Sequence, residues 1–252
     1  MSFSGKVKEE LSRQISTARH CQIAEIAAIL SVCGQVSISA NDHFCVTVHT
    51  ENVSVARKYF TLVEKTFNIE AVIHVRKNVY LKKSNVYRVE VPSHEDTVRI
   101  LQATKFMSPE QEIADDLSVM SRLVIQKECC KRAFLRGTFL AAGSISDPEK
   151  GYHLEIVCST MERAEQIQSI MKEFELDARI VTRKKNQVVY LKEGSQIVDF
   201  LGVVEAGSAL MNLENIRIRK EISNNINRKL RDCQHRENGF GSSKTDRRYQ
   251  VY

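Results

Sequence analysis

The sequence has no long uninterrupted apolar run. Its longest apolar stretches, around Ile26 and Phe139, are broken by polar or charged residues well short of the roughly 20 apolar residues that a membrane span needs. The N-terminus, from Met1 to Leu11, also lacks the apolar core of a signal peptide. Because it has neither feature, we expect a cytoplasmic protein. With 252 residues, of which 42% are hydrophobic, the chain is long enough to bury a sizeable core in one or two domains.

The cysteines lack the spacing of a metal or disulfide framework. There are seven of them, none forms a C-x-x-C pair, and none has a histidine at zinc-finger spacing. They are Cys21, Cys33, Cys45, Cys129, Cys130, Cys158 and Cys233. Reduced and mostly buried thiols are the simplest interpretation. The sequence therefore predicts no metal and no cofactor.

Outside residues 228–252 the chain also lacks a clear excess of basic charge. The formal net charge of +6 favours a polyanionic partner. Residues 228–252 hold seven of the basic residues and three acids, so most of the excess lies there. Any nucleic-acid binding by the rest of the chain must depend on local basic patches.

What the sequence does contain is a repeated helix. Residues 26–34 (IAAILSVCG) and 135–143 (LRGTFLAAG) are apolar, carry small residues along one stripe, and end at a glycine that leads into strand-like sequence. Gly34 and Gly143 are 109 positions apart, and so are Thr50 and Ser159, each of which can N-cap the following helix. This register predicts two helices packed on each other across a pseudo-twofold axis, with small residues allowing close backbone approach.

The periodicity of the flanking sequence is the same in both copies. The first copy predicts helices over residues 21–34, 54–67 and 95–103 and strands over 36–38, 44–49, 71–81 and 86–91, the first two joined by a turn at 40–43. The second predicts helices over 134–143, 161–174 and 195–201 and strands over 152–158, 178–182 and 188–192. An amphipathic helix over residues 7–15, with Ser4 as N-cap, precedes them, and residues 104–126 should form a linker with a helical stretch.

This order of elements, occurring twice, resembles the LAGLIDADG homing-endonuclease fold. Within that fold, residues 129–156 (CCKRAFLRGTFLAAGSISDPEKGYHLEI) are similar to the WhiA family, bacterial regulators linked to sporulation and cell division. Residues 2–11, 215–221 and 224–228 match the same family, so the resemblance covers about residues 1–228. It implies an α+β fold of αββαββα repeats, with saddle-shaped antiparallel sheets and a central helix pair.

The resemblance also implies a domain order. We expect an N-terminal helix (1–20), a first repeat (21–104), a linker (105–128), a second repeat (129–206), a connector helix (207–228) and a tail outside the family pattern (229–252).

Catalysis is disfavoured by the residues that precede the two glycines. LAGLIDADG enzymes hold divalent metal with one carboxylate from the end of each motif helix. Here those positions are Cys33 and Ala142. A thiol is a poor ligand for a hard magnesium ion, and a methyl group is none. Asp42 and Asp147 are expected on loops nearby, but neither occupies the motif position. We predict that the protein is not an enzyme.

Basic residues on the predicted strands and loops are the candidates for nucleic-acid binding. In the first repeat they are Arg76, Lys77, Lys82, Lys83 and Arg88, and in the second Arg179, Arg183, Lys184, Lys185 and Lys192. Phosphate contacts by such clusters would give salt-dependent binding with little sequence information. For any single residue, a solvated charged face is an equally good interpretation.

The tail departs from the family pattern. WhiA proteins continue past the position of Arg228 into a helix-turn-helix domain, whereas residues 229–252 show no helical apolar period and offer no recognition helix. Read one base out of frame from Asp232, with permitted codons, the same DNA encodes a helical sequence typical of the family. We therefore expect a frameshift near Leu230.

These observations predict a non-catalytic DNA-binding regulator of the WhiA type, acting in cell division and chromosome segregation or in sporulation gene control. Its partner would be the DNA phosphate backbone at promoter or chromosomal sites, in the nucleoid, with weakened sequence-specific binding and with another regulatory protein as a further partner; no membrane is involved. The alternative is a protein-interaction scaffold that uses the saddle without DNA. A third interpretation is an active LAGLIDADG endonuclease.

Overall fold

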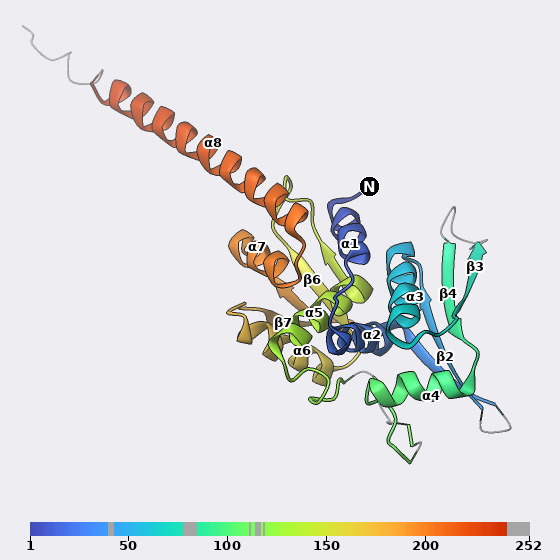
Figure 1. Ribbon diagram of the computed structural model, residues 1–252. Helices are drawn as coiled ribbons and strands as arrows, with labels where there is room; N and C mark the ends of the chain where they lie inside the picture. Colours follow the sequence, from blue (N-terminus) through green and yellow to red (C-terminus); the bar gives the residue numbers. More distant parts are fainter. Residues whose placement is uncertain (40–42, 78–84, 111, 114–116, 118, 241–252) are drawn as a thin grey trace, which may run out of the picture. The chain divides into compact units, whose positions relative to one another are not determined.

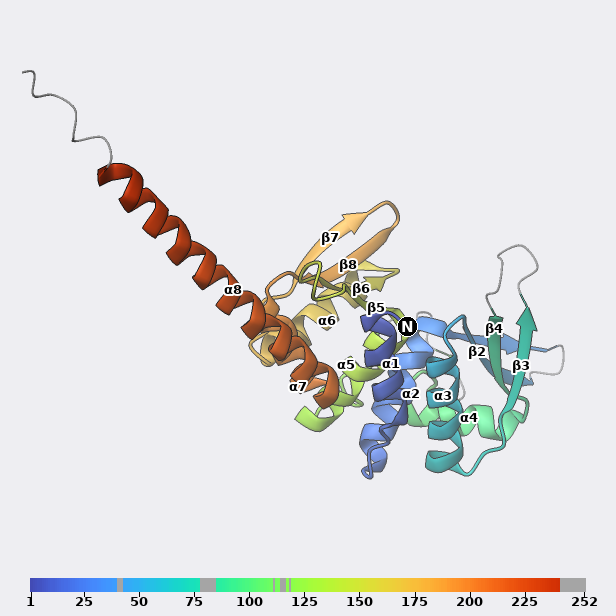
Figure 2. The same cartoon turned by 90° about the horizontal axis from the view of Figure 1, so that it is seen from above.

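Two helices, α2 (Arg19–Cys33) and α5 (Glu128–Ala142), form the centre of the fold. The computed structural model describes residues 1–39, 43–77, 85–110, 112–113, 117 and 119–240, the last eleven of these by backbone only. Figures 1 and 2 show the helix pair lying between two β-sheets. Residues 1–210 form one compact unit, and a second unit begins at Met211.

Small residues allow α2 and α5 to approach closely. Ala24, Ala27 and Ala28 on α2 are completely buried. A Cβ atom added at Gly137 on α5 would lie 2.8 Å from the carbonyl oxygen of Glu25 and 2.9 Å from the Cβ of Ala28. Because no side chain fits in that space, the repeated stripe of small residues is confirmed as the contact between the two repeats.

Each repeat builds one four-stranded antiparallel sheet. The first sheet has the order β1-β2-β4-β3 and consists of β1 (Gly34–Ile38), β2 (Phe44–Thr50), β3 (Val72–Lys77) and β4 (Asn85–Val91). The second has the order β5-β6-β8-β7 and consists of β5 (Gly143–Ile145), β6 (Leu154–Cys158), β7 (Arg179–Arg183) and β8 (Asn186–Leu191). The predicted α+β architecture with a central helix pair is therefore confirmed.

Helices cover one face of each sheet and leave the other open. In the first sheet, α3 (Val53–Phe67) and α4 (His94–Ala103) contact the central strands. In the second, α6 (Met161–Glu173) contacts β6, β7 and β8, and α7 (Gly194–Val203) follows. Alternate residues of the central strands are buried beneath them, for example Val89 and Val91 of β4, as expected for sheets with one face on the core.

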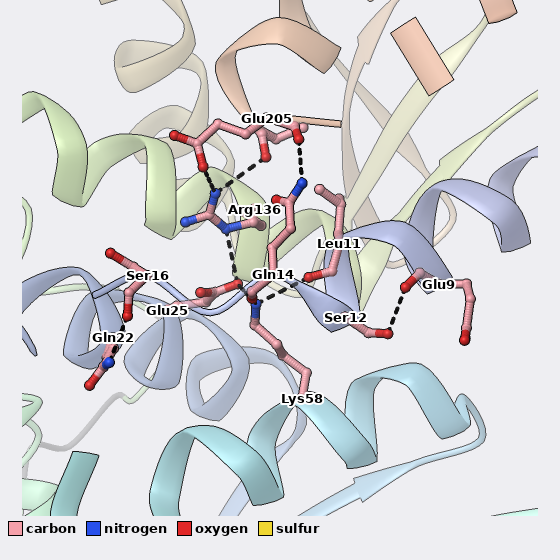
Figure 3. Close-up of polar contacts among 11 residues, drawn as sticks. Glu9, Leu11, Ser12, Gln14, Ser16, Gln22, Glu25, Lys58, Arg136 and Glu205 are labelled. Carbon is pink, nitrogen blue, oxygen red and sulfur yellow. Dashed lines mark hydrogen bonds and ion pairs between the residues drawn. The ribbon is translucent and has the colours of Figure 1, made fainter. Parts of the chain in front are cut away.

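A buried charge network ties the helix pair to its neighbours (Figure 3). Glu25 of α2 is completely buried and lies 2.9 Å from Lys58 Nζ on α3 and 3.2 Å from Arg136 Nε on α5. Lys58 also donates to the carbonyl oxygen of Leu11, in α1 (Phe3–Arg13), at 3.1 Å. Burial raises the pKa of Glu25 in spite of these two cations. The four helices are thereby held in one register by charge as well as by apolar packing.

The last helix is α8 (Gly207–Phe240). Its first turn receives a cap from α1, because Glu10 accepts hydrogen bonds from the backbone N–H groups of Ser208 and Ala209 at 2.7 and 3.0 Å. Among the described helices, none combines the length with the apolar character that a membrane crossing requires.

Several helix ends differ from the sequence prediction, because the N-cap is in each case the residue directly before the first helical residue. Ser2, not Ser4, caps α1, and that helix ends before Ile15. Asn52 and Thr160 cap α3 and α6 in place of Thr50 and Ser159. The structure favours them because an N-cap oxygen must reach the N–H groups of the first turn.

Other differences concern segments with a weak pattern. The three-residue strand β5 was not predicted. The start of α5 at 128 rather than 134 was missed, because residues 128–133 (ECCKRA) mix charged and small side chains and show no clear apolar period. Among the described residues of 104–126 there is no helix, only turns and a bridge between Met107 and Ile113. α8 continues past residue 228 to Phe240, since no proline interrupts it. Residues 40–42 and 78–81 of the predicted hairpins lie outside the described part.

Candidate nucleic-acid interface

The C-terminal ends of α2 and α5 correspond to the ends that carry catalytic acids in LAGLIDADG enzymes. Cys33 and Ala142 are half-buried there, each followed by a glycine with extended backbone. A Cβ atom at Gly34 would collide with the carbonyl oxygen of Leu30, and one at Gly143 would collide with the Phe139 side chain. Close packing at the helix ends therefore explains both glycines without any catalytic role.

Two cationic side chains lie near Cys33 at this end of the helix pair. The pKa of the Cys33 thiol is raised by burial, and the nearby charges of Arg163 and Lys8 oppose that rise. Burial lowers the pKa of Lys8 to about 8, and its ammonium lies 5.9 Å from the centre of the Phe139 ring. Arg163, also buried, bonds to the carbonyl oxygen of Ser31 and, at 3.0 Å, to its hydroxyl. Two positive side chains beside a thiol do not fit a divalent cation.

The two loop acids do not supply the missing carboxylates. Asp147 is exposed, and its carboxylate accepts a hydrogen bond from the backbone N–H of Glu149 at 3.1 Å, so it stabilises a turn. Asp42 lies outside the described residues. In the described part of the chain, no group of three or more candidate metal ligands lies at this end of the helices.

The open face of the first sheet is polar. Cross-strand register places Arg88 of β4 between His49 of β2 and His74 of β3, and Arg76 lies two residues along from His74 on the same face. Gln35 and Ser37 of β1 continue this face, by their pairing with residues of β2. His49, Arg88 and His74 thus form one row across β2, β4 and β3, and the polar side chains of β1 lie on the same face.

One glutamate shares this face with the basic residues. Glu90 lies 3.1 Å from Arg88 Nη2 and 3.8 Å from His74 Nε2. Arg88 Nε has no hydrogen-bond partner among the described residues, although it is buried. Arg76 is exposed and has no ion pair in the described part of the protein. Arg88 is therefore partly neutralised, whereas Arg76 presents its charge to solvent.

The remaining candidates of the first repeat divide into two groups. Lys77 is exposed at the end of β3, opposite Asn85, so it alternates to the other side of the strand from Arg76. Lys82 and Lys83 lie outside the described residues.

The open face of the second sheet has a comparable arrangement. Arg179 and Arg183 of β7 point to this face, and Arg179 pairs in register with Tyr190 of β8. Glu155 of β6 lies 2.8 Å from Arg183 Nη1 and 3.2 Å from His153 Nε2. Burial works against ionisation of Glu155, but hydrogen bonds from His153 and Arg183 hold its pKa below the ordinary value.

The lysines of the second repeat border the same sheet. Lys184 and Lys185 form the exposed turn between β7 and β8, and Lys184 has a positive φ of 57°. Lys192 follows β8, with its ammonium 5.1 Å from the centre of the Tyr190 ring. Arg179 is 72% exposed and lies 3.7 Å from Asp177. All five basic candidates of this repeat therefore lie on or beside one sheet.

Several further members of these faces were not predicted from the sequence. They are His49, His74, Glu90, His153, Glu155 and Tyr190. Strand alternation could have placed Glu90 and Arg88 on the same face of one strand, but the cross-strand partners depend on register, which the sequence does not give.

Two four-stranded sheets flanking a glycine-terminated helix pair define a protein of the LAGLIDADG-like class. Residues 19–107 match the family described as "WhiA N-terminal LAGLIDADG-like domain", and residues 131–223 match "WhiA LAGLIDADG-like domain". The chain belongs to the WhiA family.

Named relatives and solved structures agree with this assignment. The chain is 52% identical over 230 residues to "Probable cell division protein WhiA" of Lachnoclostridium phytofermentans, covering 91% of this chain and 73% of that protein. It is 42% identical to the protein of the same name from Alkaliphilus oremlandii, covering 90% and 72%. Full-length DUF199/WhiA from Thermatoga maritima has the same fold, with a TM-score of 0.67, 19% identity, and coverage of 94% and 75%.

A further solved structure with this fold is that of I-DmoI in complex with DNA and Mn. It has a TM-score of 0.53 and 12% identity, and the match covers 74% of this chain and 97% of the other. At this identity the likeness concerns the fold. The relatives' names describe a cell division protein and no enzyme activity.

Proposed function

We propose that this protein is a non-catalytic DNA-binding regulator that contacts the phosphate backbone through the open faces of its two sheets. The observation that carries the proposal is the placement of Arg76, Arg88, Arg179 and Arg183 on the helix-free faces of two sheets joined by one helix pair. Guanidinium groups on such faces suit bidentate phosphate contacts. In this proposal, the first sheet belongs to the repeat at residues 21–104 and the second to the repeat at residues 129–206, and residues 105–128 form the linker between them.

The biological setting follows from the family. The relatives are named for cell division, and DNA binding by this chain would serve the control of genes for division, chromosome segregation or sporulation, at the nucleoid. A regulatory protein bound to the same complex is a further expected partner. The structure of I-DmoI supports the choice of ligand, because that protein shares the fold and was solved in complex with DNA.

Absence of catalysis is part of the proposal. Its support is the chemistry around Cys33, where Lys8 and Arg163 are the nearest charges and no carboxylate ends either motif helix. Positive charge at this place repels the divalent cations that phosphodiester cleavage needs. Magnesium-dependent cleavage of duplex DNA that disappears in Asp147→Ala would contradict this part of the proposal.

Gel-shift titrations of the full chain against duplex DNA at increasing salt test the proposal. The wild type should retain DNA at low salt, and the plot of log K against log salt should have a negative slope. Replacing Arg76, Arg179 and Arg183 by alanine should flatten that slope by about 0.9 for each phosphate that the variant no longer neutralises. Arg57→Ala is the matched control, because Arg57 is half exposed on α3, on the covered side of the first sheet.

The competing function is a protein-interaction scaffold. The observation in its favour is that Glu90 and Glu155 already pair with arginines on the open faces, which lowers the positive charge offered to DNA. If the wild type fails to retain DNA even at low salt, the DNA proposal is wrong and the scaffold function replaces it.

A further inference from the structure

A cluster of one histidine and three cysteines lies where the two central helices begin. His20 and Cys21 occupy the first turn of α2, and Cys129 and Cys130 occupy the first turn of α5. One ligand atom from each of these four residues can be chosen so that all four lie within 4.8 Å of one another. Cys21 and Cys130 are buried, while His20 and Cys129 are exposed, so the cluster is anchored in the core and open to solvent on one side.

The separations within the cluster are close to those of a tetrahedral metal site. His20 Nδ1 lies 3.3 Å from Cys21 Sγ, 3.2 Å from Cys130 Sγ and 3.9 Å from Cys129 Sγ. Zinc–sulfur and zinc–nitrogen bonds of about 2.3 and 2.0 Å at tetrahedral angles imply ligand separations of about 3.5–3.8 Å. The three distances from His20 therefore need changes of only a few tenths of an ångström. The other separations, all within 4.8 Å, need side-chain adjustments of at most about 1 Å.

In the metal-free protein, burial and the neighbouring thiols raise the pKa of Cys21 and of Cys130, so a bound metal ion must displace their protons. The two helix ends favour that exchange. Both helices direct their N-terminal ends, which carry partial positive charge, toward the cluster. Neither α2 nor α5 has a side-chain N-cap, whereas α1, α3, α4 and α6 each have one. Three thiolates and one neutral imidazole around a divalent cation would carry one net negative charge, which the two uncapped helix ends stabilise.

The repeat explains why the sequence did not reveal the cluster. His20 and Cys129 are 109 positions apart, as are Cys21 and Cys130, so the ligands come as two adjacent pairs from equivalent positions of the two repeats. Zinc-finger spacings place both pairs within one short segment. Here only the close packing of α2 against α5 brings the pairs together.

We propose that His20, Cys21, Cys129 and Cys130 bind one Zn²⁺ ion. With four protein ligands the site is closed to substrate, and its role is structural. The ion would join the N-terminal ends of the central helices, and hence the two repeats. At a rise of 1.5 Å per residue the site lies about 20 Å along α2 from Cys33, so it is separate from the end that corresponds to the nuclease centre.

Metal binding by the reduced, metal-free full chain tests the proposal. Titration with Zn²⁺ against a chromophoric chelator should give one ion per chain, and Co²⁺ should give the intense visible absorption of a tetrahedral thiolate site. Cys129→Ser and His20→Ala should each weaken Zn²⁺ binding at least about tenfold, since changing a residue that merely orients a metal ligand already has an effect of that size. Both residues are exposed, so the variants should keep the wild-type circular dichroism.

Cys45→Ser is the matched control, because it removes a half-buried thiol on β2 far along the chain from the cluster. It should bind Zn²⁺ as the wild type does. The proposal is overturned if the reduced wild type binds no zinc, if Cys129→Ser binds it equally well, or if cobalt gives only the weak absorption of an octahedral ion.

Discussion

Arg183 Nη1 lies 2.8 Å from Glu155 Oε2 on the open face of the second sheet. One of the strongest candidate phosphate ligands is therefore already paired with a carboxylate of the protein. DNA must compete with Glu155 for this guanidinium, and the competition sets how much the arginine contributes to binding.

Glu155→Gln should strengthen DNA binding. Removing the carboxylate charge frees Arg183 and His153 for phosphate, and a surface ion pair of about 0.2–1 kcal/mol corresponds to a gain of up to about fivefold in affinity. Gel shifts at a fixed low salt concentration measure the change. Glu173→Gln, which breaks the ion pair between Glu173 of α6 and Lys131 of α5, is the control and should leave affinity within the error of the wild type. Unchanged affinity in Glu155→Gln would mean that Arg183 does not contact DNA.

Lys58→Met should strongly destabilise the fold. It leaves Glu25 buried without the ammonium at 2.9 Å, and breaking one partner of a buried pair costs about 3–5 kcal/mol. Urea denaturation followed by circular dichroism gives the free energy of unfolding. Arg13→Ala, which breaks a pair in which the arginine is 72% exposed, should cost no more than about 1 kcal/mol. Equal effects would contradict the view that the network holds the helices together.

Gly137→Ala should also destabilise the protein, by about 1–3 kcal/mol, because its Cβ atom must push α2 away. Alanine is intrinsically better than glycine inside a helix by about 1 kcal/mol, so a decrease in stability reports the packing alone. Gly202→Ala in α7 is the control, since the nearest neighbour of its Cβ atom lies at an ordinary 3.5 Å. That variant should be neutral or more stable than the wild type in the same urea titration.

Lys8→Met should stabilise the fold in a pH-dependent way. The folded pKa of Lys8 is about 8, against 10.5 for a free lysine, because burial disfavours the charge. Between these values the unfolded chain binds more protons, so the stability of the wild type rises with pH. The advantage of Lys8→Met should therefore be complete below pH 8 and shrink as the pH approaches 10.5.

Urea titrations at about pH 7 and about pH 9.5, on either side of the folded pKa, measure this change. The matched control is Lys6→Met, an exposed lysine on the same helix. An advantage of Lys8→Met that is independent of pH would contradict the buried position of this ammonium.

The architecture was largely predictable from the sequence, and the site only in part. The glycines at 34 and 143 and the 109-residue register indicated the helix pair and both sheets, because small residues and alternation report local packing. The caps at Asn52 and Thr160 were missed because the neighbouring residues Thr50 and Ser159 have a similar N-cap propensity. The strand β5 was missed because three residues are too few to show a pattern.

Contacts between segments far apart in the sequence were not predictable. Glu155 pairs with Arg183 only through the order of three strands, and His20 meets Cys130 only through the packing of α2 on α5. Single-sequence patterns carry no information on such pairs, because they depend on register and on helix approach.

The helix pair between the two sheets also bears on avidity. A duplex held by one open face would meet the other as an intramolecular partner, at an effective concentration fixed by the rigid helices rather than by diffusion. The binding constants of the two faces would then multiply rather than add. Removing the arginines of either sheet should therefore cost far more than half of the affinity.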